Sequence, residues 1–248
     1  MSDYDGAMVS FGGGINSTAL VIYLAEQGWR GDVVFADTGC EHPETYCYMQ
    51  YFEAEYLTPR GLTLTRLRGL PYQRGRATLP LVDYCEQHGM VPLAAARWCT
   101  KDWKGKPIER WCAANGDPLQ LLGIAAEEAH RAPEKARPLV DAGIDRRECV
   151  AIIQRAGLDV PQKSGCTICP FQRDSQWHGL WRLHPELFER AARLEEGASA
   201  RTGRFITLDP AGKITLRQRQ ARYEAQMPLI DDATMDGLRA FQPCVCGL

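Results

Sequence analysis

The chain has 248 residues, which suits one domain or one domain with an appendage, and its 45% hydrophobic content excludes a disordered protein. A formal net charge of −2 excludes a basic field over the whole surface, although a local basic patch stays open. No apolar run approaches the roughly 20 residues that span a bilayer. The acidic N-terminal segment lacks the basic start and apolar middle of a signal peptide. We therefore expect a cytoplasmic protein with no membrane partner.

The first part of the chain alternates between strands and helices. Short apolar runs at residues 7–11, 32–36 and 62–67 are typical of strands. Between them, residues 17–28 and 42–57 have the apolar spacing of helices. This order predicts an α/β fold with a doubly wound parallel sheet.

Further elements follow in the same style. The sequence predicts a short helix at residues 81–89, a helix ending near Asn115, a buried strand within 118–126 and an amphipathic helix over 145–158. These elements extend the α/β pattern to about residue 160.

The alternation of predicted strands and helices ends after Pro161. Residues 184–197 have helical spacing, and residues 204–216 resemble a small hairpin that turns at Pro-Ala-Gly. We therefore expect an α/β domain over residues 1–160 and a small, mostly helical, cysteine-containing region over residues 161–248.

Three consecutive glycines, residues 12–14, stand between the first strand and the first helix. In a parallel sheet this position lies at the carboxyl ends of the strands, where ligands bind. Free N–H groups at a helix start bind anions, and glycine lets the backbone approach a phosphate closely. The loop lacks the lysine of a Walker loop, and Ser17 stands where the dinucleotide fingerprint needs glycine. The loop is therefore a phosphate-binding candidate of another type.

Ten cysteines need an explanation, because stable disulfides are not expected in a reducing compartment. Cys166 and Cys169 form a Cys-x-x-Cys pair followed by Pro170, a pattern shared by zinc knuckles, iron–sulfur half-sites and redox pairs. A zinc site needs a second pair of comparable spacing, and Cys244 and Cys246 stand too close together for that. We expect the cysteines on apolar helix faces to be core residues: Cys47, Cys85, Cys112 and Cys149.

Several motifs together resemble one family. "SFGGGINST" at residues 10–18 is similar to the pyrophosphate-binding loop of the PP-loop ATPases, and more narrowly to the branch that contains phosphoadenosine phosphosulfate (PAPS) reductase. "DTGCEHPET" at 37–45, "RWCTKDWKGKPIERW" at 97–111 and "LLGIAAEEAHRA" at 121–132 resemble further motifs of that family. The resemblance covers most of residues 7–195. It implies the adenine nucleotide alpha hydrolase-like, Rossmann-like fold, in an iron–sulfur-containing branch.

The resemblance also implies a bound nucleotide, either ATP or a sulfonucleotide (PAPS or APS). Asp37 would lie near the ribose or a metal ion, and Arg131 would face a phosphate or sulfate. Asn16 replaces an aspartate that many ATP-cleaving members carry, which leaves open whether ATP is cleaved or only bound. The predicted nucleotide contacts are Ser10, Gly12, Gly13, Gly14, Asn16, Ser17, Thr18, Asp37, Thr38, Gly39, Gly123, Glu127 and Arg131.

By the same resemblance, Cys99 joins Cys166 and Cys169 as ligands of a [4Fe–4S] cluster. Three protein ligands would leave one iron open. Cys246 is a fourth ligand, a catalytic thiol or neither. The catalytic candidates are Cys246, Asp37 and Lys104. We expect the aromatic residues that follow the cysteine pair to shield the cluster from water: Trp177, Trp181 and Phe188.

Three functions are compatible with these features. In the first, ATP adenylates an oxygen of a nucleic-acid or related acceptor, pyrophosphate leaves, and cluster-held sulfur displaces AMP. In the second, a thiol such as that of Cys246 attacks a sulfonucleotide and sulfite leaves. The segment at residues 166–171 favours the first, and a non-catalytic nucleotide sensor is the third. Further candidates are a magnesium ion (Mg2+), a tRNA or DNA substrate, a sulfur donor or thioredoxin-like reductant, and a homodimer.

Overall fold

The structure, a computed structural model, describes residues 4–68 and 79–226. Cys244 and Cys246 lie outside the described residues, so the predicted roles of Cys246 stay predictions. Within the described ranges, no helix combines the length and the apolar character that crossing a membrane requires.

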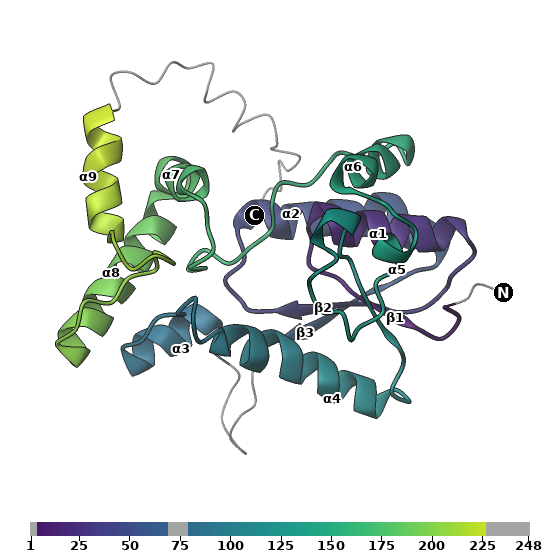
Figure 1. Ribbon diagram of the computed structural model, residues 1–248, viewed down its shortest axis with the longest axis horizontal. Helices are drawn as coiled ribbons and strands as arrows, with labels where there is room; N and C mark the ends of the chain where they lie inside the picture. The colour runs from purple at the N-terminus through teal and green to yellow at the C-terminus, as the bar shows by residue number, and fades with distance from the viewer. Residues whose placement is uncertain (1–3, 69–78, 227–248) are drawn as a thin grey trace.

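A four-stranded parallel sheet forms the centre of the N-terminal part (Figure 1). Its strands are β1 (Met8–Ser10), β2 (Val33–Asp37), β3 (Leu64–Arg68) and β4 (Gln120–Leu122). Their spatial order is β3-β2-β1-β4, and all four expected strands are confirmed. Because the chain winds outward to β3 and then returns to the other side of β1, the winding reverses between β1 and β4. Ligands of doubly wound sheets bind at such a reversal.

Helices cover both faces of the sheet, which confirms the doubly wound α/β class (Figure 1). On one face lie α1 (Ile15–Glu26), α2 (Pro43–Phe52), the short α5 (Pro138–Asp141) and α6 (Arg146–Arg155); on the other lies α4 (Lys106–Ala114). Alternate side chains of β2 explain this arrangement. Val33 and Phe35 belong to the core shared with α1, whereas Val34 and Ala36 pack with Ile108 of α4.

Turns of π-helix or 3-10 helix extend two of the α-helices, α2 and α4. α2 continues through a π-helical turn, Glu53–Leu57, and a 3-10 turn, Thr58–Arg60. A second π-helical turn, Thr100–Gly105, leads into α4, whose C-cap is Asn115, as expected from the sequence. A 3-10 turn, Ala126–Glu128, follows β4.

The C-terminal part gathers its helices at one end of the molecule (Figure 1). They are α7 (Asp174–Leu183), α8 (Pro185–Thr202) and α9 (Leu216–Gln226), with α3 (Leu81–His88) beside them. Their apolar side chains form a second core around Trp177, Leu180 and Phe188. Trp103 and side chains of α3 belong to the same core, so segments on both sides of residue 161 build it.

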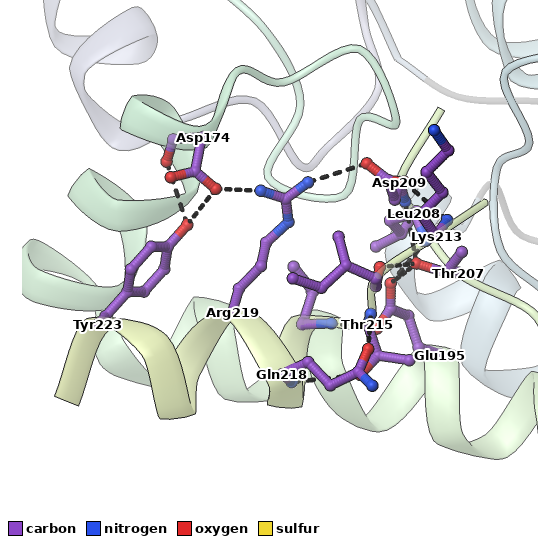
Figure 2. A network of polar contacts seen from close by, with 12 residues as sticks. Asp174, Glu195, Thr207, Leu208, Asp209, Lys213, Thr215, Gln218, Arg219 and Tyr223 are labelled. Carbon is purple, nitrogen blue, oxygen red and sulfur yellow. Dashed lines mark hydrogen bonds and ion pairs between the residues drawn. The ribbon is translucent and has the colours of Figure 1, made fainter. Parts of the chain in front are cut away.

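The prediction of a hairpin at residues 204–216 is wrong, because this fully described segment contains no strand. Figure 2 shows that the segment wraps around a buried carboxylate. Glu195, 2% exposed, accepts hydrogen bonds from the Leu208 and Leu216 N–H groups and from the Thr207 hydroxyl, at 2.5, 2.6 and 2.9 Å. A carboxylate thus organises this loop in place of cross-strand pairing.

Candidate functional site

The glycine loop at residues 12–14 turns the chain from β1 into α1 and presents backbone N–H groups. Gly13 has a left-handed φ of 67°, and Gly14 is the N-cap of α1. The N–H groups of Gly12 and Gly14 both point at the Ser17 hydroxyl oxygen, at 3.2 and 3.3 Å. Two backbone donors that converge on one oxygen, next to the positive end of a helix, form a suitable cradle for an anionic oxygen.

A cleft of about 870 Å³ opens in front of this loop, at the reversal between β1 and β4. Gly123, directly after β4, makes room for the loop: a Cβ atom on it would lie 2.6 Å from the Ser17 Cα. The structure brings together along the cleft seven of the predicted nucleotide contacts: Ser10, Gly12, Gly14, Asn16, Ser17, Gly123 and Arg131.

One carboxylate in the cleft was missed by the sequence analysis. Glu128 accepts a hydrogen bond from Asn16 Nδ2 at 3.3 Å and pairs with Arg131 Nη1 at 2.9 Å. The predicted Glu127 instead accepts from the Arg146 N–H, 3.2 Å away, at the start of α6. The 3-10 turn after β4 decides which of the two adjacent glutamates faces the cleft, and sequence spacing does not reveal that turn.

Positive charge dominates the cleft lining. Besides Arg131, the cleft is lined by the cations Arg97, Arg146 and Lys163, whereas Glu128 is the carboxylate in its lining. A polyphosphate would compensate this excess of positive charge.

The other predicted nucleotide contacts do not line this cleft. The Asp37 carboxylate accepts from the Tyr46 hydroxyl at 2.6 Å and from the Gly39 N–H at 2.8 Å. Burial, together with this contact to Asp37, raises the pKa of Tyr46. Thr18 is fully buried in α1, and Gly13 faces the side chains of α2.

A second cavity, of about 270 Å³, brings together the three cysteines predicted as cluster ligands. Cys99 precedes the π-helical turn before α4, and Cys166 and Cys169 lie on the loop before α7. The remaining lining includes apolar residues, among them Leu81, Ile168, Pro170 and Phe171. Its polar members are Thr38, Arg97, Thr100, Lys104, Lys163, Ser164, Gln172 and Gln176.

A buried carboxylate organises the floor of this cysteine cavity. Glu41, whose side chain is 1% exposed, forms an isolated antiparallel bridge with Cys166. Its Oε1 accepts from the Thr38 hydroxyl at 3.0 Å, from Lys104 Nζ at 2.9 Å and from the Cys166 thiol at 3.3 Å. Glu41 could not be identified from the sequence patterns, although it follows the second strand by only a few residues.

Burial determines the protonation of the thiols. It raises the pKa of Cys99 and raises that of Cys169 to about 11. A hydrogen bond with Cys166, together with burial, raises the pKa of Cys40. Burial opposes the charge of Lys104, but Glu41 raises its pKa above the ordinary value. The thiols of Cys40, Cys99 and Cys169 are therefore neutral near pH 7 unless a bound cation stabilises their thiolates.

The cleft and the cysteine cavity lie next to each other. Arg97, Lys163 and Ser164 line both. Ser164 also touches the glycine loop, because a Cβ atom on Gly14 would lie 2.8 Å from its Oγ. A ligand held on the glycine loop can therefore extend toward the cysteines.

The chain is similar to several known proteins. Residues 6–132 match the sequence profile of the phosphoadenosine phosphosulfate reductase domain. The chain is 28% identical over 200 residues to an uncharacterized nin region protein of Escherichia phage lambda, covering 70% of this chain and 68% of that protein.

It is also 26% identical over 205 residues to an uncharacterized protein of Methanocaldococcus jannaschii; the match covers 74% of this chain and spans 40% of that protein's length. The crystal structure of a PAPS reductase from Candida auris, in complex with phosphate, is similar with a TM-score of 0.48 and 16% identity. That similarity covers 66% of this chain and 82% of the other.

Proposed function

The chain belongs to the phosphoadenosine phosphosulfate reductase domain family, and from this membership we propose that it is an ATP-dependent sulfur transferase. The nucleotide binds on the glycine loop, and sulfur is transferred in the cysteine cavity. One observation carries the proposal: the cleft and the cysteine cavity share Arg97, Lys163 and Ser164 in their linings. Activation and sulfur transfer can therefore take place on one bound acceptor.

The proposed reaction has two steps. An oxygen atom of a nucleic-acid or related acceptor attacks the α-phosphorus of ATP, and the bond to pyrophosphate breaks. A sulfide-level sulfur donor then attacks the activated atom of the acceptor, and AMP leaves with the oxygen that sulfur replaces. The amides of Gly12 and Gly14 hold phosphate oxygens, and Arg131 balances their negative charge.

We propose that Cys99, Cys166 and Cys169 hold a [4Fe–4S] cluster. Three protein ligands would leave one iron of such a cluster without a protein ligand, and the cluster would then supply a position for sulfur. The shared cavity and its apolar lining support this assignment. Within residues 4–68 and 79–226, no three His, Cys, Asp or Glu side chains converge closely enough for a single metal ion. The buried Trp177 and Phe188 belong to the same core as Cys166.

The experiment is anaerobic purification followed by iron and sulfide analysis of the wild type and three variants. We expect about four iron atoms per chain in the wild type and in Cys47→Ser, which removes a thiol outside the cysteine cavity. Cys99→Ser and Cys169→Ser should lose most of the iron. Iron content that is equal in all four proteins, or zinc in place of iron, would contradict the cluster.

The reaction is tested with the same preparations. Pyrophosphate release from ATP, dependent on an acceptor and sulfide, is the expected result. Sulfite release from PAPS with reduced thioredoxin, without pyrophosphate release from ATP, would replace the transferase by a sulfonucleotide reductase. ATP binding with neither activity would indicate a nucleotide sensor.

A further inference from the structure

Two cationic side chains, Arg97 and Lys163, lie where the cleft meets the cysteine cavity. Within the described ranges, 4–68 and 79–226, neither Arg97 nor Lys163 forms an ion pair, and both line the two cavities. Lys163 Nζ donates to Gln176 Oε1 at 3.1 Å, a neutral partner. The junction therefore carries positive charge that no carboxylate of the described residues compensates. This charge adds to the partial positive charge of the glycine-loop amides.

The backbone of Arg97 adopts a conformation that is unfavourable for a residue with a side chain. Its φ of 45° is left-handed, which costs a residue with a Cβ atom about 1 kcal/mol relative to glycine. Its N–H donates to the Leu93 carbonyl at 3.1 Å, so the backbone is held there by a turn. A long cationic side chain at a position that favours glycine indicates that the side chain has a role.

An exposed aromatic ring lies beside Arg97. Phe171 is 48% exposed although it lines the apolar cysteine cavity, and Leu93 on the same cavity is 39% exposed. The Arg97 guanidinium lies 5.6 Å from the centroid of the Phe171 ring. Exposed apolar surface at a cavity, next to a cation, suits a ligand that combines a planar ring with an anion.

We infer that Arg97, Lys163 and Phe171 form the acceptor subsite and that the acceptor presents one nucleotide unit to it. The base stacks on Phe171, and the phosphate pairs with Arg97 and Lys163. This inference rests on the proposed function, since it identifies what the transferase modifies. A free nucleotide and a single-stranded nucleic acid share this chemistry. Stacking accepts every base, so the subsite recognises a nucleotide unit without specifying its sequence.

The test measures binding by fluorescence anisotropy, with the glycine loop saturated by a non-hydrolysable ATP analogue. The probes are a labelled single-stranded oligonucleotide, its abasic counterpart, and a pyrimidine mononucleotide as competitor. Arg97→Gly removes the cation at a position where glycine relieves the backbone, so its thermal stability should equal or exceed that of the wild type. Arg155→Ala, at the exposed end of α6, is the control for loss of one positive charge.

Phe171→Leu should weaken binding of the base-bearing oligonucleotide about tenfold and leave the abasic one unchanged. Arg97→Gly should weaken binding of both about tenfold, as expected for loss of a phosphate contact. Arg155→Ala should match the wild type. Competition by the mononucleotide at the oligonucleotide's own affinity would identify a free nucleotide as the ligand, and weaker competition would identify a single strand.

Wild-type affinity in both Arg97→Gly and Phe171→Leu would overturn the subsite, as would a wild type that binds neither probe. Binding of the ATP analogue is measured separately by calorimetry. If the analogue binds and the probes do not, the subsite fails while the proposed nucleotide site stands. If the analogue itself does not bind, the proposed function fails.

Discussion

At the scale of single residues, the glycine loop depends on the absence of one side chain. A Cβ atom on Gly123 would lie 2.6 Å from the Ser17 Cα and 2.7 Å from its N, so the backbone would have to move. We expect Gly123→Ala to lower the free energy of unfolding by roughly 1–3 kcal/mol. It should also weaken ATP binding about tenfold, because the amides of the loop would lose their alignment. Urea unfolding and calorimetry measure the two effects.

Gly197 is the matched control for this substitution. It lies within α8, and a Cβ atom there meets nothing within 4 Å. Gly197→Ala should raise the free energy of unfolding by about 0.5–1 kcal/mol through helix propensity and leave ATP binding unchanged. Equal effects of the two substitutions would contradict the steric explanation.

At the scale of elements, Arg219 attaches α9 to the rest of the C-terminal part (Figure 2). Its guanidinium bridges Asp174 of α7 and Asp209 of the preceding loop, at 2.9 Å from Asp209 Oδ1. Arg219 and Asp209 have side chains only 10% and 9% exposed. Arg219→Met would leave the Asp209 carboxylate buried without its cation, and should cost about 3 kcal/mol of unfolding free energy.

Arg217, on the same helix, is the control for this prediction, because it forms ion pairs that are more exposed than the pair between Arg219 and Asp209. Its partners Glu189 and Glu196 are 36% and 52% exposed, so Arg217→Met should cost at most about 1 kcal/mol. Chemical unfolding of both variants measures the difference. Similar losses in the two variants would mean that burial of the Arg219 pair is not the source of the stability.

At the scale of the whole molecule, an ion pair links α2, which covers the sheet, to the C-terminal helices. His184, between α7 and α8, lies 2.7 Å from Glu44 of α2. The hydrogen bond to Glu44 raises the pKa of His184 against the effect of burial. Burial opposes the charge of Glu44, but His184 holds its pKa below the ordinary value.

The pair therefore predicts a pH window of extra stability. The His184 contribution is complete below its ordinary pKa of 6.5 and is lost as the pH rises through the raised value. The Glu44 contribution is complete above 4.5 and is lost as the pH falls through the lowered value. Glu44→Gln should lower the free energy of unfolding by about 1 kcal/mol near pH 5.5, and by much less at pH 9.

Unfolding curves at a series of pH values measure this effect. His88→Gln is the control, since this exposed histidine bonds to a backbone carbonyl and has no acidic partner among the described residues. Its curve should remain parallel to that of the wild type. A Glu44→Gln difference that is constant from pH 5 to pH 9 would contradict the pair's role.

The sequence by itself determined the parallel sheet and the position of the glycine loop. Alternating apolar runs and helical spacing are local patterns, so the four strands and their parallel pairing followed from them. The glycine loop could be located from the sequence for the same reason, since the three glycines and the left-handed φ of Gly13 belong to consecutive residues. The π-helical turns next to α2 and α4 did not follow, because their apolar spacing is that of an ordinary helix.

Only the tertiary structure decided how distant segments meet. It put Glu128 in the cleft in place of Glu127, and it placed Glu41 under Cys166. It replaced the expected hairpin by a loop around Glu195. The physical reason is the same in each case: a polar group takes the partner that the folded chain brings within hydrogen-bond distance, and no local pattern of residues encodes that partner.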